Sequence, residues 1–287
     1  NIYKMCQVAQ TDLTTPGALY LVEGNIVHPQ DAAGARNTNN TSYRPVAVNT
    51  SNFAISPAST TRPQTPAIQA WRDLGQGGRP DPDVSIASVD VPGDGRLWVA
   101  SKATDLGNGL WHYEYAVENT SSHRSVGAIA VAIAPGSPAS SPGFHDVNPH
   151  SDEILDGTDW TFERTPCAAR WSCTPFAVNP DANALRWGTL YNVRFDSPSP
   201  PANGTIRLEL FRPGTPSAMN APAVVPSGAG SADFNRDGFT DFFDYDAYVE
   251  CFETAACPPG ADADFNGDGF ADFFDYDAFV TAFESGC

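Results

Sequence analysis

Apolar and polar residues alternate through most of the first 212 positions, in short segments separated by Gly, Pro, Asn and Asp. The clearest segment, RLWVASKATDLGNGLWHYEYAVENT at residues 96–120, holds two alternating runs on either side of DLGNG. Gly and Asn accept positive φ angles, so this segment predicts a β-hairpin. The two faces of its second arm differ in polarity. One face holds Trp111, Tyr113, Tyr115 and Val117, and the other holds His112, Glu114 and Glu118.

The same two-residue period recurs at residues 127–133, 184–195 and 205–211. Two sheets packed through the apolar faces of such strands form a sandwich. The sequence therefore predicts a mainly β fold, an antiparallel β-sandwich, for residues 1–212. The residues that share a packed face are Trp187, Thr189, Tyr191, Val193 and Phe195 in one run, and Ile206, Leu208 and Leu210 in another.

The first 74 residues follow a less regular pattern. Strand-like segments lie at ALYLVEGNIVH (residues 18–28) and YRPVAVNT (residues 43–50). The segment AIQAWRDL (residues 67–74) suits one or two helical turns. We expect this stretch to extend the sandwich.

After residue 230 the apolar period changes from that of a strand to that of a helix. ADFNRDGFTDFFDYDAYVECFE at residues 232–253 and ADFNGDGFADFFDYDAFVTAFE at residues 263–284 are near copies. Pro and Gly ahead of each copy exclude an entering helix, so each copy predicts a loop followed by one short amphipathic helix. The helically spaced apolar residues are Phe242, Tyr245, Val249 and Phe252, then Phe273, Tyr276, Val280 and Phe283.

A Pro, Gly and Ala-rich segment separates the two regions. Its composition at residues 213–230 predicts a semi-extended linker. The expected organisation is a sandwich at residues 1–212, this linker, and a small α-helical module at residues 231–287.

The twelve-residue loop that opens each copy has oxygen donors at positions 1, 3, 5, 9 and 12, glycine at position 6 and a backbone carbonyl at position 7. This is the spacing of an EF-hand calcium loop, in which hard oxygen ligands wrap a hard cation and glycine permits the sharp turn. Two matches in tandem predict two bound Ca²⁺ ions, against the alternative that the aspartates only cap turns. The predicted ligands are Asp233, Asn235, Asp237, Phe239, Asp241 and Asp244 in the first loop, and Asp264, Asn266, Asp268, Phe270, Asp272 and Asp275 in the second.

This duplicated half EF-hand, with Asp in place of Glu at position 12, resembles the type I dockerin module of bacterial extracellular proteins. The resemblance covers about residues 231–287 and implies calcium-dependent docking to a cohesin partner. Dockerins usually contact their partner through positions 10 and 11 of each loop. Here these positions are Phe242, Phe243, Phe273 and Phe274, in place of the Ser/Thr pattern of many cohesin-binding dockerins. Alternatively, these rings pack the two helices together or against the sandwich.

The β region resembles uncharacterised regions of large secreted bacterial proteins. Such proteins carry WHYEYAVEN, GFHDV, DGTDW and NALRWGTLYNVRFD in this order before a dockerin-like end, and all four are present here. The resemblance covers about residues 1–220. It implies export and a shared architecture, but no activity.

The formal net charge of −18 is unevenly distributed. Residues 231–287 hold fourteen Asp or Glu against one Arg, a net −13, which leaves −5 for the first 230 residues. Such a field attracts cations and repels phosphate, so nucleic acid is not expected as a partner. No run of eighteen apolar residues exists, so we expect a mature or trimmed chain with no membrane span.

Six cysteines and only two lysines suggest an oxidising, secreted or cell-surface setting. Local loops closed by Cys167 with Cys173 and by Cys251 with Cys257 would leave Cys6 and Cys287 to join chain ends or neighbouring chains. Pairing of Cys287 with Cys251 or Cys257 is equally allowed. Candidate acceptors of N-linked glycans begin N-x-S/T triplets at Asn39, Asn40, Asn49, Asn119 and Asn203.

Other polar groups could support chemistry, although a structural role is favoured for each. A cluster in GFHDVNPHSDEILDGTDW could bind zinc or transfer protons, but Pro149 excludes a helix there and a polar loop is the simpler interpretation. His112 and Glu114 could form an acid and base pair or simply face solvent on a strand. The cluster consists of His145, Asp146, His150, Asp152 and Glu153, with Asp156 and Asp159 as candidates for a third cation site.

The tryptophans could form a sugar-stacking platform. Trp111 and Trp187 belong to apolar alternations and are expected in the core, which leaves Trp171 as the best exposed candidate among Trp98, Trp111, Trp160, Trp171 and Trp187. No G-x-S-x-G, phosphate-binding loop, CxxC pair or His-Glu-x-x-His occurs. No catalytic residue is therefore predicted.

These patterns favour a secreted, non-catalytic structural protein. Its calcium-stabilised tail would join subunits or attach the chain to an extracellular assembly, with another copy of itself, as in a filament, or a cohesin-like scaffold as protein partner. The alternative is a carbohydrate-binding or carbohydrate-degrading exoprotein, with a glycan ligand, that the tail docks to a scaffold.

Overall fold

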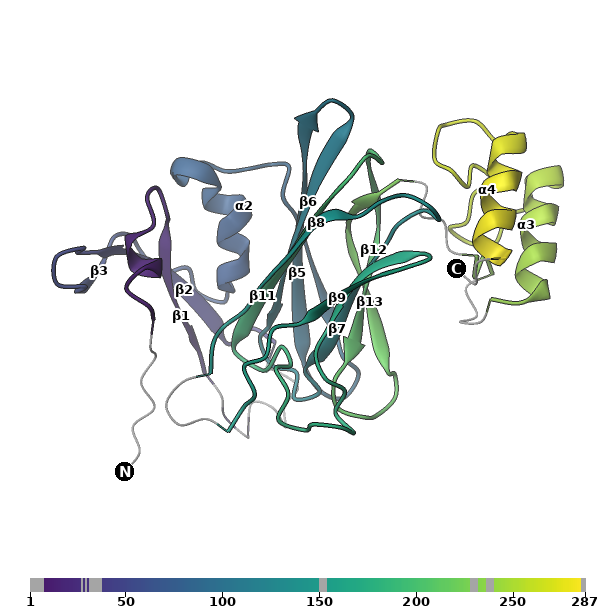
Figure 1. Cartoon of the computed structure of the whole chain (residues 1–287). Helices are drawn as coiled ribbons and strands as arrows, with labels where there is room; N and C mark the ends of the chain where they lie inside the picture. Colours follow the sequence, from purple (N-terminus) through teal and green to yellow (C-terminus); the bar gives the residue numbers. More distant parts are fainter. Residues whose placement is uncertain are drawn as a thin grey trace.

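The computed structural model describes residues 8–26, 28, 30, 38–149, 154–227, 232–235 and 240–284. Two five-stranded antiparallel sheets face each other and form the β-sandwich (Figure 1). One sheet has the order β13 (Ala218–Pro226), β12 (Pro201–Leu210), β7 (Val126–Ala132), β10 (Ala168–Ser172) and β9 (Thr161–Thr165). The other has the order β4 (Ser85–Asp90), β5 (Arg96–Gly107), β6 (Leu110–Asn119), β11 (Thr189–Ser197) and β8 (Ser140–His145).

The predicted apolar faces meet in the core between these sheets. Tyr113 and Tyr115 of β6 are fully buried, and both rings stack near Phe195 of β11, at centroid distances of 5.4 and 6.3 Å. Ile206 and Leu208 of β12 close the core from the other sheet. The mainly β sandwich fold is therefore confirmed.

The predicted hairpin joins β5 to β6. Its two connecting residues, Asn108 and Gly109, have φ angles of 55° and 76°. Positive φ at both positions of a two-residue turn matches the twist of the flanking strands. The Asn-Gly pair therefore places Gly107 opposite Leu110, and a register shift between Asp105 and Gly107 then brings His112 opposite Thr104.

Strand β13 corrects the prediction of a linker at residues 213–230, which is wrong for residues 218–226. This segment pairs with β12 along its whole length and buries Ala221, Ala223 and Val225. The strand lies at the edge of its sheet, where the missing N–H of Pro222 is tolerated. The small size of its core residues hid the alternation from a pattern based on large side chains.

Two tryptophans differ from the prediction in opposite directions, since one that was expected to be exposed is buried and one that was expected in the core is exposed. Trp171 lies in β10 and is 1% exposed, packed on Phe162 and Phe195, so the prediction that it is exposed is wrong. Trp187 is 47% exposed, because β11 begins only at Thr189 and Gly188 turns the chain with a φ of 76°. The apolar period thus does not extend back to Trp187.

One of the two expected local disulfides forms. Cys251 and Cys257 are bonded, as predicted, with a Cα–Cα distance of 4.3 Å. The pairing of Cys167 with Cys173 is wrong, because Cys173 is a free thiol and Cys167 is disulfide-bonded elsewhere. Extended β10 separates the two by six steps of about 3.3 Å, well beyond the reach of a disulfide. Cys6 and Cys287 lie outside the described residues.

The N-terminal region forms its own sheet and does not extend either sheet of the sandwich. Its strands are β1 (Tyr20–Asn25), β2 (Thr41–Val48) and β3 (Ile55–Pro57). The predicted helical turns are η2 (Ala67–Gln69) and α2 (Ala70–Leu74), which cover the outer face of the second sheet through Ile68 and Trp71. Two further short turns are η1 (Asp12–Thr14) and η3 (Gln76–Gly78).

The C-terminal helices α3 (Phe242–Thr254) and α4 (Phe273–Glu284) begin where the repeat predicts, and form a unit beside the sandwich (Figure 1). Within the part of the chain that the structure describes, no helix is long and apolar enough to cross a membrane.

Asn119 illustrates how a buried polar side chain closes the sandwich. Its side chain is fully buried, accepts the Ser122 N–H at 2.8 Å and donates to the carbonyl groups of Ser122 and Leu185 at 2.9 and 3.1 Å. Among the N-x-S/T triplets, this asparagine therefore holds a turn, whereas Asn203 on β12 is exposed.

We predict that Asn119→Ala lowers the free energy of unfolding by about 1–3 kcal/mol, because it leaves buried donors and acceptors without partners. Asn203→Ala, in the same kind of triplet but exposed, should stay within about 0.5 kcal/mol of the parent chain. Urea denaturation of both variants measures this. Equal effects at the two positions would contradict the structural role of Asn119.

Candidate metal centre

The second loop of the repeat, residues 264–275, is held closed by its own side chains. The Asp264 carboxylate accepts three backbone N–H bonds, from Gly267, Asp268 and Gly269, at 2.8–3.1 Å. Asn266 Oδ1 accepts the Asp268 N–H at 2.9 Å. The positive φ angles at Gly267 and Gly269, 75° and 95°, turn the backbone toward these acceptors. The glycine expected at position 6 thus has the conformation that the loop requires.

Asp275, at position 12, joins the two ends of this loop. Its side chain is fully buried, and its two oxygens accept the N–H groups of Asn266 and Asp272 at 2.8 Å each. Asp272 in turn accepts the Phe274 N–H at 2.8 Å and so caps the start of α4. One carboxylate in the first turn of α4 therefore ties position 3 of the loop to position 9.

The first loop repeats this arrangement wherever it is described. Asp244 is fully buried and accepts the N–H groups of Asn235 and Asp241 at 2.9 Å each. Asp241 caps α3 by accepting the Phe243 N–H at 2.9 Å. Two of the predicted ligands, Asp237 and Phe239, lie outside the described residues.

The aromatic cluster between the helices connects the two loops. Tyr248 of α3 and Phe279 of α4 stack at a centroid distance of 4.0 Å and are fully buried. The ring at position 2 of each loop, Phe234 or Phe265, contacts both of these rings edge-on. The sequence analysis did not single out these two residues, because they are not calcium ligands. The signal that could have identified them is that phenylalanine occupies the same position in both copies of the repeat.

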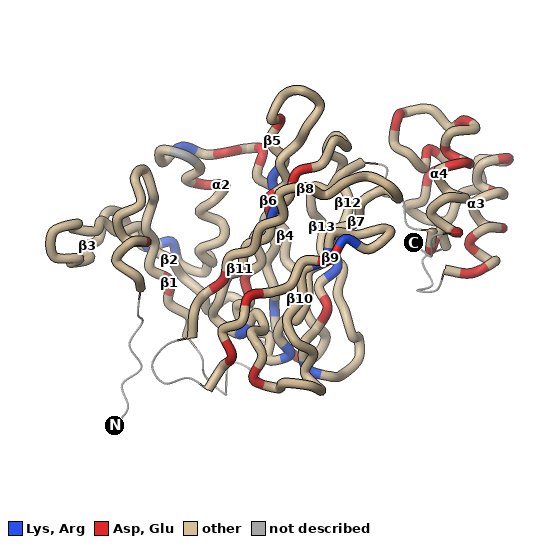
Figure 2. The backbone as a smooth tube through the Cα atoms, in the orientation of Figure 1, with Lys and Arg blue, Asp and Glu red and all other residues tan. Residues whose placement is uncertain are grey.

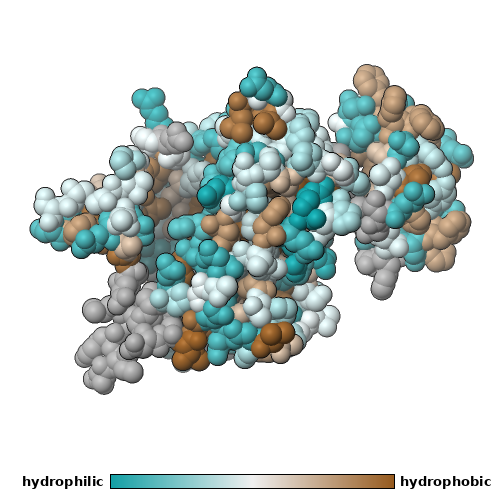
Figure 3. Space-filling model, in the orientation of Figure 1, coloured by the Kyte–Doolittle hydropathy of each residue, from teal (hydrophilic) through white to brown (hydrophobic). Residues whose placement is uncertain are grey.

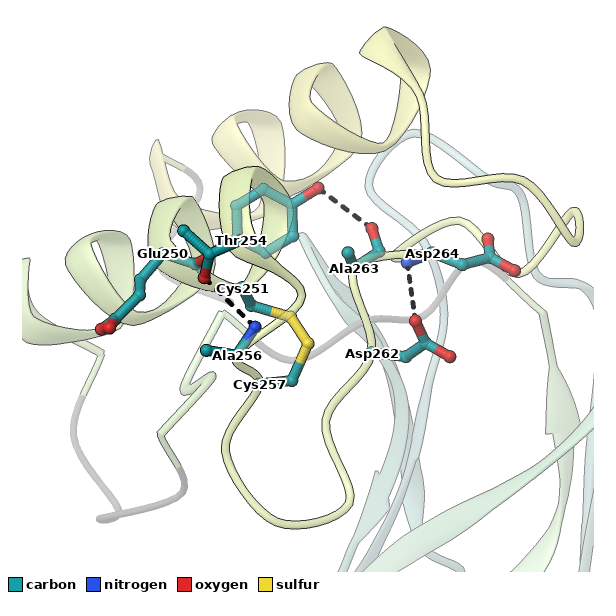
Figure 4. The surroundings of a disulfide bond; sticks show 9 residues. Glu250, Cys251, Thr254, Ala256, Cys257, Asp262, Ala263 and Asp264 are labelled. Atoms are coloured by element: carbon teal, nitrogen blue, oxygen red, sulfur yellow. Dashed lines mark hydrogen bonds between the residues drawn. A yellow bond between two sulfur atoms is a disulfide. The ribbon is translucent and has the colours of Figure 1, made fainter.

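A disulfide fixes the connection from the first helix to the second loop (Figure 4). Ala255 ends α3 in the left-handed conformation, with φ 59°, and donates to the Cys251 carbonyl at 2.9 Å. Cys257 then bonds back to Cys251. The Tyr248 hydroxyl donates to the Ala263 carbonyl at 3.3 Å, immediately before the second loop. The loop therefore starts at a fixed point against the helix pair.

The module concentrates negative charge, as Figure 2 shows for the region of α3 and α4. The one basic residue of residues 231–287, Arg236, lies outside the described residues. Burial raises the pKa of the Tyr248 hydroxyl, and the carboxylates of Asp275 and Asp264 raise it further. The field of the second loop therefore reaches the centre of the ring cluster.

The oxygen-only donor set suits Ca²⁺. A carboxylate offers about four lone-pair sites, and Asp264 and Asp275 use three and two of them for N–H groups, so each retains capacity for a cation. In the described parts of the chain, no three His, Cys, Asp or Glu side chains already form a metal cluster. Binding of Ca²⁺ therefore remains a prediction from the donor set.

Five phenylalanine rings among the described residues of the module face solvent, and we call them the phenylalanine surface. Their side chains are 66–73% exposed, and apolar side chains gather on the outside of this unit in Figure 3. The alternative that the rings at positions 10 and 11 pack between the helices or on the sandwich is therefore wrong. The surface consists of Phe242, Phe243, Phe270, Phe273 and Phe274.

The other candidate clusters hold structural bonds. Asp146 accepts a hydrogen bond from the Asn183 side chain, while His145 is exposed at the end of β8. Asp156 accepts the N–H and hydroxyl of Thr158 at 2.9 and 2.6 Å, and these bonds lower its pKa. The predicted members His150, Asp152 and Glu153 lie outside the described residues, and Asp159 belongs to no metal cluster among those described.

His112 and Glu114 each pair with β11 and not with each other. His112 Nδ1 lies 2.6 Å from Asp196 Oδ1, and Glu114 accepts the Asn192 amide at 3.0 Å. These contacts join the strands on the outer face of the sheet. The structural interpretation of this pair is therefore supported.

Comparisons with known proteins give no family for the chain. No family model and no curated protein matches it. Among solved structures, a GH20 exo-β-N-acetylglucosaminidase from Vibrio harveyi, crystallised as its inactive D437A mutant, is similar at 11% identity with a TM-score of 0.28. That match covers 50% of this chain and 19% of the enzyme. At this score it supports no argument about function.

We predict that Asp275→Asn lowers the stability of the helical module by about 1–3 kcal/mol, because the amide nitrogen that replaces one of the two buried Asp275 oxygens cannot accept an N–H. Urea denaturation followed by helical circular dichroism measures the change.

The matched control is Asp277→Asn, which removes the same charge from an exposed position of α4. If both variants lost the same stability, net charge and not the buried position of Asp275 would be the cause.

Proposed function

We propose that residues 231–287 bind two Ca²⁺ ions, and that the bound ions hold α3 and α4 together as a connector to a protein partner. The chain would act as a secreted, non-catalytic component of an extracellular or cell-surface assembly. The observation that most supports this proposal is the matched pair of buried carboxylates, Asp244 and Asp275, at position 12 of loops with the same hydrogen bonds.

Burial makes these two charges costly unless a positive group compensates them. Among the described residues of the module there is no Lys, Arg or His. A divalent cation in each loop supplies that compensation. The residues that would hold the ions are Asp233, Asn235, Asp237, Asp241 and Asp244 with the Phe239 carbonyl, and Asp264, Asn266, Asp268, Asp272 and Asp275 with the Phe270 carbonyl.

The phenylalanine surface supports a role in attachment. Large apolar side chains gathered on one small charged unit are typical of a protein contact, since a soluble monomer rarely exposes such a patch. The resemblance to dockerins offers two partners, another copy of this chain or a cohesin-like scaffold. Both would use the rings at positions 10 and 11.

The alternative function, a carbohydrate-binding or carbohydrate-degrading exoprotein, has less support. It depends on an exposed ring platform, and Trp171 is buried in the core. The remaining exposed tryptophan, Trp187, already donates its Nε1–H to the Thr120 carbonyl at 2.5 Å.

Removal of calcium should open the helical module and leave the sandwich intact. We predict that EDTA abolishes hydrogen-exchange protection in α3 and α4, because repulsion among the loop carboxylates is then uncompensated. Protection in β5, β6 and β11 should not change. Hydrogen-exchange mass spectrometry of the whole chain, with and without EDTA, measures both regions.

The control for this experiment is restoration with excess Ca²⁺ and, separately, with Mg²⁺, which requires a stricter octahedral geometry. Protection in α3 and α4 that EDTA leaves untouched would contradict a calcium-held module.

The phenylalanine surface should mediate calcium-dependent association. We predict that replacing Phe242, Phe243, Phe273 and Phe274 by Ser abolishes it while the unfolding free energy changes by about 0.5 kcal/mol or less per site, because the rings are exposed. Light scattering of the whole chain with calcium measures the association.

The matched control is Val178→Ser, which removes a 75% exposed apolar side chain from the sandwich. A parent chain that is monomeric with and without calcium would exclude another copy as the partner. Association that survives in the four-fold variant would exclude this surface.

A further inference from the structure

A pair of glutamates lies between the N-terminal sheet and the sandwich, far from the calcium loops. Glu23 is on β1, and Glu118 is on the outer face of β6, 95 positions later. Glu23 accepts the Ala67 N–H at 2.5 Å, and Glu118 accepts the Ile68 N–H at 3.0 Å. Two carboxyl groups from separate sheets thus bind consecutive amides at the start of η2.

Glu118 is 3% exposed, and its second oxygen, Oε1, is buried with no hydrogen-bond donor among the described groups. The neighbouring polar group is the Glu23 carboxyl, which interacts directly with it. Two ionised carboxylates can only accept hydrogen bonds, so this contact would be repulsive. A single proton shared between the two carboxyl groups converts this contact into a hydrogen bond.

No basic side chain among the described residues forms an ion pair with Glu23 or Glu118. Glu118 faces Trp98 of β5 and Leu190 of β11 across the sheet, and Glu23 faces Tyr43 of β2. The Tyr43 hydroxyl is also buried, and its pKa is raised by burial and by Asp73 and lowered by Arg62 and Arg72. Among the described residues, none of these side chains forms an ion pair with either glutamate.

We propose that Glu23 and Glu118 form a proton-binding site that fastens the N-terminal sheet and η2 to the outer face of the sandwich. The bound proton provides the bond between the two carboxyl groups, and the two backbone N–H groups hold the remaining oxygens. When the proton is lost, two negative charges face each other in a buried contact. The N-terminal sheet then separates more readily.

The direction of the pH dependence follows from burial. Burial and the charge of Glu23 raise the pKa of Glu118 from its ordinary value of 4.5 to about 9. When the N-terminal sheet is attached, the two glutamates therefore keep their shared proton between about pH 4.5 and 9. When the sheet separates and water reaches the two glutamates, they release this proton over the same pH range. Attachment is strongest at the acidic end of this range and weakens as the pH rises. One proton allows at most about a tenfold change in the opening equilibrium for each pH unit.

Hydrogen exchange of the β1 amides, corrected for the intrinsic pH dependence of exchange, tests the site on the whole chain. In the parent chain, the opening equilibrium should rise up to about tenfold per unit between about pH 6 and 8. Glu118→Gln, which keeps the shape and supplies a donor, should remove this slope. Glu114→Gln, on the same face of β6 but bonded to Asn192, should keep it.

A flat parent profile, or a slope that persists in Glu118→Gln, overturns the proposal. If Glu118→Gln fails to fold, the carboxyl carbon resonances of the parent chain decide. One glutamate that titrates above about pH 6 supports the site. A chain whose glutamates all titrate below about pH 6 contradicts it.

Discussion

Two aspartate carboxylates without solvent exposure, Asp244 and Asp275, set the requirements of the C-terminal module. Each satisfies two backbone N–H groups, which lowers the cost of burying its charge but does not cancel it. The sequence supplies no basic side chain to the described part of the module, where every other charged side chain is also negative. A divalent cation in each loop is the compensation that the residues are suited to hold.

The two loops and the two helices share one packed aromatic core, so a change in a loop affects the helix pair. The position-2 rings, Phe234 and Phe265, each touch the stacked pair of Tyr248 and Phe279. A loop that opens would therefore withdraw a ring from the centre of the small core. Since the Cys251–Cys257 disulfide holds only the connection between the repeats, the loops themselves depend on their oxygen network. The phenylalanine surface lies on the same loops and first helical turns, so its shape should follow their state.

The two-residue alternation of apolar side chains and the duplicated C-terminal sequence were sufficient to predict the strands and helices that bury large side chains. Tyr113, Tyr115 and Phe195 are in the core as alternation predicts, and both C-terminal helices follow their loops. For the candidate site, the sequence predicts the donor positions of each loop from spacing alone, because they lie within twelve residues of one another. The bonds to Asp275 then show how these donors close the loop.

The features that the sequence did not predict correctly have a related physical cause. Each is determined by contacts between residues distant in sequence or by a local bend of the chain. Strand β13 was hidden because its core residues are mostly alanine and its prolines suggest a linker. The cysteine pair failed because a strand keeps Cys167 and Cys173 apart. Glu23 and Glu118 could not be paired from the sequence, because only the packing of one sheet on another brings them together.

Whether calcium holds the helical module together can be measured by calcium titration of the EDTA-treated chain, with calorimetry for the stoichiometry and circular dichroism for the helical signal. We predict two ions per chain, bound at or below millimolar concentration, with the helical signal recovered as the loops fill. A chain that binds no calcium at millimolar concentration while α3 and α4 stay folded would contradict it.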